Sequence, residues 1–243
     1  MTIGGIPNNI LVSDLDDTLI HKFLSKEENS SNLIKILQLY NKAIIVINTA
    51  RSYRSIIQDL QIPSDYLSKN ILITNCGQRI FLQGIEDNDW KKIVLKALEP
   101  SYDLIINIKS LIEKAKYKVE KVVKVDKFYV NYKVSLLSKS LENELNQYLI
   151  NTEFCICSNK NNVKLISKYI NKGTAFKFIK SKIPKIKKII GLGNNVLDYF
   201  FLQYCNDIYW INNSEIIQNS ISIYNQKMME NFIKLLTKQI IMV

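Results

Sequence analysis

Residues 10–18 read Ile-Leu-Val-Ser-Asp-Leu-Asp-Asp-Thr, an apolar run followed at once by acidic side chains. The run Ile10–Val12 predicts a short buried strand, and the acidic residues fall at its carboxyl end. Open parallel sheets bind their ligands at that end. Because side chains alternate along an extended chain, we expect Asp14 and Asp16 to point the same way. The stretch therefore predicts an α/β fold with a polar site at the edge of a parallel sheet.

The segments that follow alternate short apolar runs with helical spacings, which is typical of parallel strands joined by crossover helices. In the first third, the predicted strands are Ala43–Ile47 and Ile71–Thr74 with a return at Arg79–Leu82, and the predicted helices are Leu33–Tyr40, capped by Ser30 or Ser31, and Ser52–Leu60. In the last third, the predicted helices are Thr174–Lys182, Asp198–Tyr204, Ser214–Ser222 and Gln226–Ile241, and the predicted strands are Lys188–Ile190 and Ile208–Ile211. Together they predict a Rossmann-like core with a parallel sheet.

The middle of the chain follows a different pattern and predicts an inserted α+β domain. From Phe128 to Val134, every second side chain is apolar and faces one way, which is typical of an antiparallel sheet with one buried face. Helices predicted at Trp90–Leu98, Tyr102–Ala115 and Leu136–Leu149 would cover that face. We therefore expect a discontinuous core, residues 1–83 and 166–243, with a cap domain at residues 84–165.

The composition disfavours a membrane protein, a nucleic-acid-binding protein and a zinc protein. The chain has 243 residues, 47% of them hydrophobic, which is enough to bury a core, and its apolar runs are far shorter than the roughly 20 residues of a membrane helix. The net charge of +11 reflects either an anionic partner or AT-rich coding, and the scattered lysines disfavour nucleic acid. Four cysteines without Cys-x-x-Cys spacing and a single histidine disfavour a zinc site. The sequence predicts a cytoplasmic protein that binds neither membrane nor nucleic acid.

Two carboxylates at one sheet edge need a cation between them. Magnesium, which prefers carboxylate and carbonyl oxygens, would neutralise Asp14 and Asp16. Asp14 is then free to attack phosphorus while Asp16 handles the proton of the leaving group. Thr49, directly after the second strand, supplies a hydroxyl where phosphoryl oxygens could be held. The plainer interpretation is that the acidic residues and Thr49 only cap helices.

The order and spacing of these residues resemble the haloacid dehalogenase superfamily. Asp14 and Asp16 match its first motif, Thr49 its second, and Lys172 its third. The resemblance implies that Asp14 forms an aspartyl-phosphate, that Asp16 acts first as acid and then as base, and that Lys172 bridges nucleophile and phosphate. It also implies that Thr49, Arg51 and Lys172 bind the substrate.

The segment Gly193–Asp198 resembles the fourth motif of that superfamily, usually Gly-Asp-x-x-Asn-Asp. Asn194 stands where the family has an aspartate that binds the metal, and only the last acid, Asp198, is kept. The resemblance implies a Mg²⁺ site formed by Asp14, Asp16, Asn194 and Asp198. Because an amide oxygen is a weaker ligand than a carboxylate, we expect a lowered metal affinity.

The large insert and the segments Val12–Asp16, Thr49–Tyr53 and Asn171–Thr174 resemble sucrose-phosphate phosphatase and its relatives, which include mannosyl-phosphoglycerate phosphatase. The resemblance implies a magnesium-dependent phosphatase that acts on a sugar phosphate or a similar small phosphorylated metabolite. Two alternatives stay open. One is a related protein that binds phosphorylated ligands without turnover, and the other is phosphoryl transfer between sugar positions, as in phosphomannomutases.

Overall fold

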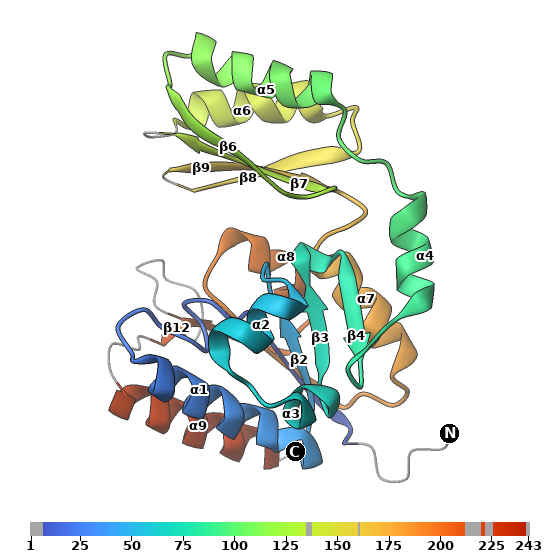
Figure 1. The fold of residues 1–243 in the computed structure, drawn as a ribbon, viewed down its shortest axis with the longest axis vertical. Helices are drawn as coiled ribbons and strands as arrows, with labels where there is room; N and C mark the ends of the chain where they lie inside the picture. Colours follow the sequence, from blue (N-terminus) through green and yellow to red (C-terminus); the bar gives the residue numbers. More distant parts are fainter. Residues whose placement is uncertain (1–6, 135–137, 160, 212–219, 222–225, 242–243) are drawn as a thin grey trace. The chain divides into compact units, whose positions relative to one another are not determined.

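The computed structural model describes residues 7–134, 138–159, 161–211, 220–221 and 226–241. The chain divides into two compact units (Figure 1), Met1–Lys91 with Lys172–Val243, and Lys92–Asn171. The insert thus begins and ends later along the chain than the predicted range, residues 84–165.

The first unit is built on an eight-stranded sheet with the order β12-β11-β10-β1-β2-β3-β4-β5. Neighbouring strands from β12 to β3 pair in parallel, and β4 and β5 add an antiparallel edge. The strands are β1 Asn9–Ser13, β2 Ile44–Asn48, β3 Ile71–Thr74, β4 Arg79–Leu82, β5 Ile85–Glu86, β10 Lys188–Gly193, β11 Asp207–Ile211 and β12 Ser220–Ile221. The predicted parallel core is confirmed.

Helices cover both faces of this sheet. Side chains such as Leu11 and Ile45 form one buried cluster with Leu33 of α1 and Leu236 of α9. On the other face, α8 lies against Gly191, where an added Cβ would come within 2.6 Å of the Leu202 side chain. The helices of this unit are α1 Lys26–Leu37, η1 Gln38–Asn41, α2 Tyr53–Leu60, α3 Ser64–Ser68, η2 Asn75–Gly77, α7 Lys172–Lys182, η3 Val196–Asp198, α8 Tyr199–Leu202 and α9 Gln226–Ile241.

The second unit has a four-stranded antiparallel sheet with the order β6-β7-β9-β8. Its elements are α5 Tyr102–Lys114, β6 Val119–Asp126, β7 Tyr129–Val134, α6 Lys139–Leu149, β8 Phe154–Asn159 and β9 Asn162–Ser167. Val130 and Tyr132 of β7 are buried against Ile108 of α5 and Leu145 of α6. The predicted one-sided sheet with covering helices is therefore confirmed for α5 and α6.

The first of the three predicted helices does not cover the antiparallel sheet, so that part of the prediction was wrong. This helix, α4 Asn88–Lys96, contributes no side chain to the buried cluster described for the antiparallel sheet. Trp90 instead donates from Nε1 to the carbonyl of Gly77 at 2.9 Å and packs against Phe178, both in the first unit. The helical spacing of apolar residues predicts a buried face, but it does not specify which of two cores covers that face.

Two terminal details also differ from the predictions. Ser25 caps α1 in a capping box with Glu28, so neither Ser30 nor Ser31 is the cap. Of the predicted helix 214–222, most lies outside the described residues, and Ser220–Ile221 forms strand β12. Within the described part of the chain, every helix is too short or too polar to cross a bilayer.

Candidate active site

The carboxyl ends of three neighbouring strands carry the candidate residues. In the order β10-β1-β2 the strands run in parallel, so the residues that follow them meet at one edge of the sheet. Asp14 follows β1, Thr49 follows β2 and Asn194 follows β10. The backbone N–H of Asp14 donates to the carbonyl of Leu192 at 3.0 Å, which ties the segment after β1 to β10.

A buried ion-pair group is the centre of this edge. Lys172 Nζ lies 2.6 Å from Asp14 Oδ1 and 2.7 Å from Asp198 Oδ1. The exposed fractions of the three side chains are 5% for Lys172, 9% for Asp14 and 0% for Asp198. The structure thus brings together residues from the predicted first, third and fourth motifs.

The position of Lys172 is fixed from two sides. The side-chain amide of Asn48, the last residue of β2, donates to the carbonyl of Lys172 at 2.9 Å. A Cβ added to Gly173 would lie 2.1 Å from the carbonyl oxygen of Phe200, so only glycine lets α7 approach α8 this closely. These two contacts fix the position of the first turn of α7, and from there the Lys172 side chain reaches Asp14.

The charges in this group do not balance. Burial, followed by the negative charge of Asp198, raises the pKa of Asp14 to about 7, although the ammonium of Lys172 acts in the opposite direction. Burial by itself would lower the pKa of Lys172, but the charges of Asp14 and Asp198 outweigh it and raise that pKa. Lys172 is therefore a permanent cation between two carboxylates. The remaining negative charge favours a further cation at Asp14.

Asp198 also organises the segment after β10. Its Oδ2 accepts from the backbone N–H groups of Asn194 and Asn195 at 3.0 and 2.9 Å. A Cβ on Gly193 would lie 2.7 Å from the Cβ of Asp198, so glycine is required for this turn. With Lys172 on Oδ1, donors engage both oxygens of Asp198, one of the four predicted metal-binding residues.

Asn194 contacts the backbone of the first motif. Its Nδ2 donates to the main-chain carbonyl of Asp16 at 3.0 Å. The residue that replaces the usual aspartate therefore lies beside the segment that carries the candidate nucleophile. Among the described residues, no group of three or more histidine, cysteine, aspartate or glutamate side chains forms a metal site.

Asp16 has a different environment from Asp14. Its carboxylate is 46% exposed and is held by Arg51, whose Nη2 lies 2.6 Å from Oδ1 and whose Nε lies 3.0 Å from both oxygens. These hydrogen bonds raise the pKa of Arg51. β1 ends at Ser13, before both acids, and Leu15 between them is fully buried in the core.

Thr49 is buried at the end of β2, and its neighbours explain how that segment is held. Its hydroxyl oxygen accepts from the backbone N–H of Arg51 at 3.1 Å, and its own N–H donates to the carbonyl of Ile73. Asn48 is not among the predicted site residues, yet its side chain fixes the backbone of Lys172. The signal for Asn48 was present, because a polar residue that ends an apolar run is buried with the strand.

Comparisons with known proteins identify the family of this chain and its fold. The sequence profile of the family described as Sucrose-6F-phosphate phosphohydrolase matches residues 7–193, which contain Asp14, Thr49 and Lys172 and end before Asn194. A comparison with curated protein sequences gave no match.

Solved structures share the fold over almost the whole chain. The sucrose-phosphatase from Synechocystis sp. PCC6803 is 14% identical, with a TM-score of 0.66 over 95% of this chain and 98% of that chain. A haloacid dehalogenase-like hydrolase from B. subtilis is 16% identical, with a TM-score of 0.64 over 93% and 99%. The C-terminal domain of C. albicans trehalose-6-phosphate phosphatase is 12% identical, with a TM-score of 0.63 over 94% and 91%.

At these identities the structures show a shared fold, that of the haloacid dehalogenase-like phosphatases, with a parallel core and a separate antiparallel cap. The family profile covers well over half of the residues. The chain therefore belongs to the sucrose-6F-phosphate phosphohydrolase family.

Proposed function

We propose that the protein is a Mg²⁺-dependent phosphatase that hydrolyses a sugar phosphate through an aspartyl-phosphate at Asp14. The observation that carries this proposal is the buried contact of Lys172 with Asp14 and Asp198 at the carboxyl ends of the parallel strands. A carboxylate held by a fixed ammonium is oriented for attack, and the ammonium also offsets the negative charge of an incoming phosphoryl group.

In the first step, a carboxylate oxygen of Asp14 attacks phosphorus and the bond from phosphorus to the sugar oxygen breaks. Asp16 gives that oxygen its proton. In the second step, Asp16 takes a proton from water, the water oxygen bonds to phosphorus, and the bond from phosphorus to Asp14 breaks to release phosphate. Arg51 positions the Asp16 carboxylate for both transfers, and Thr49 holds a phosphoryl oxygen.

The donor atoms at this edge suit magnesium. Asp14 offers a carboxylate, and the main-chain carbonyl of Asp16 and the side-chain carbonyl of Asn194 are the neighbouring neutral oxygens. Magnesium commonly takes only one or two carboxylates and fills its other positions with water and substrate phosphate. When bound, it would neutralise phosphoryl charge beside Asp14. With Asn194 in place of an acid, we expect the metal to bind chiefly together with the phosphorylated substrate.

The names of the relatives support a sugar phosphate as substrate. The family is described by sucrose-6F-phosphate, the Synechocystis structure was solved with sucrose and phosphate, and another similar structure is a trehalose-6-phosphate phosphatase. We infer that this chain acts on a phosphorylated sugar of the same class.

Phosphate release from sucrose 6-phosphate, trehalose 6-phosphate and hexose phosphates, with Mg²⁺ and with chelator, tests the proposal. We expect turnover of at least one substrate with Mg²⁺ and none with chelator or with Asp14→Asn. Asp65→Asn, an exposed acid at the start of α3, is the matched control and should keep full activity. Equal release by wild type and Asp14→Asn would refute the role of Asp14.

One observation favours a second candidate, a protein that binds phosphorylated sugars without turnover. Asn194 supplies an amide where a carboxylate is usual, and both oxygens of Asp198 already accept hydrogen bonds. Calorimetric binding of a sugar phosphate that is not hydrolysed over days with millimolar Mg²⁺ would support this candidate instead.

A further inference from the structure

A cavity lies at the end of the parallel strands that is opposite to the candidate active site. Its volume is about 520 Å³, and its wall includes Ile44 and Ile71, the first residues of β2 and β3, and Leu82, the last residue of antiparallel β4. Asp14 follows the last residue of β1, which is parallel to β2. The cavity and the candidate active site therefore lie at opposite ends of the parallel strands, and the proposed phosphatase chemistry does not use the cavity.

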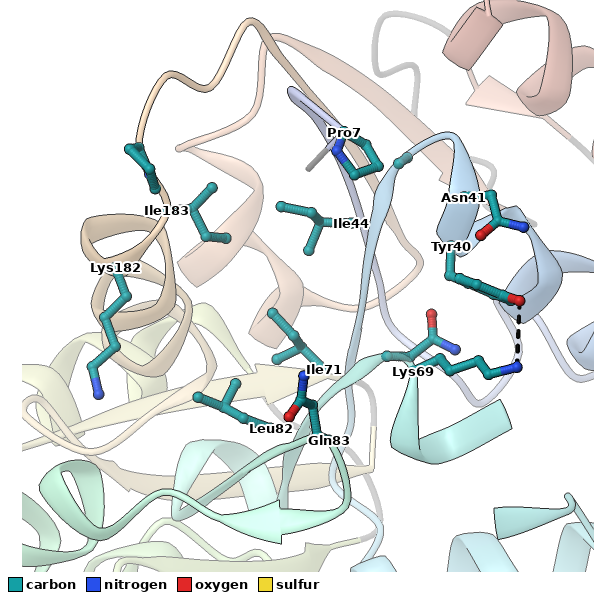
Figure 2. A pocket seen from close by; sticks show the side chains of 13 residues that line it. Pro7, Tyr40, Asn41, Ile44, Lys69, Ile71, Leu82, Gln83, Lys182 and Ile183 are labelled. Atoms are coloured by element: carbon teal, nitrogen blue, oxygen red, sulfur yellow. Dashed lines mark hydrogen bonds between the residues drawn. The ribbon is translucent and has the colours of Figure 1, made fainter. Parts of the chain in front are cut away.

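The cavity has an aliphatic centre. Figure 2 shows Ile44, Ile71 and Leu82 between Lys182 and Ile183 on one side and Tyr40 and Lys69 on the other. Side chains at the ends of core strands are normally covered, but Ile44, Ile71 and Leu82 all keep part of their surface exposed. The volume lies within the range of pockets that hold small molecules, roughly 300–1,000 Å³.

The two lysines beside this aliphatic centre differ in their charge balance. Lys182 Nζ lies 2.8 Å from Asp87 and 3.2 Å from Asp89, so carboxylates of the protein neutralise it. Lys69 Nζ donates to the hydroxyl of Tyr40 at 3.3 Å and lies 4.9 Å from the centre of its ring. In the part of the chain that the structure describes, Lys69 forms no ion pair with a carboxylate.

We propose that this cavity binds a small amphipathic anion, with an aromatic or branched aliphatic body and one carboxylate. The body fills the space over Ile44, Ile71 and Leu82, and the carboxylate pairs with Lys69 beside the Tyr40 hydroxyl. Carboxylate recognition follows from the unbalanced ammonium, and the apolar body follows from the aliphatic wall.

A matched pair of probes tests the proposal, 1-naphthoate and the uncharged 1-naphthalenemethanol, titrated calorimetrically into the full chain. We expect one site per chain and about fivefold tighter binding of 1-naphthoate, the factor that one exposed ion pair of about 1 kcal/mol supplies. Lys69→Met, which keeps the length and removes the charge, should bring the two affinities together. Lys35→Met, on α1 and outside the cavity wall, should leave them different.

Variants that fill the cavity with a tryptophan side chain test the proposal independently. Leu82→Trp should abolish binding of both probes, and Ile183→Trp, in the loop after α7, repeats the block without changing a strand. Circular dichroism checks that each variant is folded. Absence of saturable 1-naphthoate binding, equal affinity for both probes in wild type, or binding that survives both tryptophan variants would overturn the proposal. No phosphatase activity is needed for these measurements, so they stand apart from the proposed function.

Discussion

Arg51 holds Asp16 through three hydrogen-bond contacts, with Nη2 2.6 Å from Oδ1 and Nε 3.0 Å from both carboxylate oxygens. The same guanidinium also lies 3.4 Å from Asp59 of α2. Asp16 is half-exposed and without this partner would sample many orientations. Arg51 is therefore a positioning residue for the proposed acid and base.

Replacing Arg51 should weaken proton transfer more than substrate binding. We expect Arg51→Met to lower kcat on a sugar phosphate by about 10²-fold, because a misplaced acid loses most of its effect. With p-nitrophenyl phosphate, whose leaving group needs no proton, the initial burst of nitrophenolate should be largely kept. Arg54→Met, which removes a hydrogen bond to Gln58, is the control. A burst that falls as far as kcat would instead indicate a role for Arg51 in binding phosphate.

Removing the ammonium of Lys172 should unfold the site as well as inactivate it. Lys172→Met leaves Asp14 and Asp198 buried without a cation, and we expect a loss of roughly 3–5 kcal/mol in the free energy of unfolding at pH 8. At pH 5 the loss should be smaller, because Asp14, whose pKa burial raises to about 7, then carries a proton and no longer needs the cation. Urea unfolding at both pH values measures this difference. A loss that does not depend on pH would contradict the ion-pair account.

Asp14→Asn should inactivate the protein and stabilise it. Burial and Asp198 raise the pKa of Asp14 to about 7 in the folded state, above the ordinary 3.8, so the folded chain holds a proton that the unfolded chain releases. Wild type therefore loses stability as pH rises from about 4 to about 7, and the uncharged asparagine does not. We expect the variant to gain a few kcal/mol at pH 8, and almost nothing below pH 4.

Urea unfolding with chelator present measures the free energies of unfolding of wild type and Asp14→Asn. Chelator is needed because a bound cation would stabilise the ionised form of Asp14. A variant that is less stable than wild type at pH 8 would show that Asp14 does not carry the unfavourable buried charge.

Restoring the acid at position 194 should separate metal affinity from stability. Asn194→Asp adds a carboxylate beside the segment that carries Asp14 and Asp16, and we expect the Mg²⁺ concentration for half-maximal activity to fall about tenfold. Without metal, the variant loses the hydrogen bond to Asp16 and gains a repulsive charge, so it should be less stable by about 1–2 kcal/mol. Magnesium titrations and chelator-treated unfolding report the two effects separately. An unchanged magnesium requirement would exclude Asn194 from the metal site.

Several elements of the fold follow from local patterns. The alternation of apolar runs and helical spacings predicted the strands of the parallel core. An apolar run must be buried whichever segment packs against it, so its own composition is enough to identify it. The N-cap of α1 could also be predicted, since Ser25 and Glu28 have capping-box spacing. The prediction of Ser30 or Ser31 as the cap overlooked this spacing. Asp14 and Thr49 were predicted because each follows a strand end, and Lys172 and Asp198 because their segments resemble family motifs.

By itself, the amino-acid sequence determined the parallel core, the inserted antiparallel sheet and the identity of the candidate residues. Only the tertiary structure decided their partners. The Lys172 contact with Asp14 spans 158 positions, Arg51 reaches Asp16 across 35, and Trp90 joins the first unit and not the second. Local propensity fixes where a strand ends, but which charges meet there depends on the order of strands in the sheet and on close packing such as that of Gly173 against Phe200. Those contacts form between distant segments and leave no periodic signal in the chain.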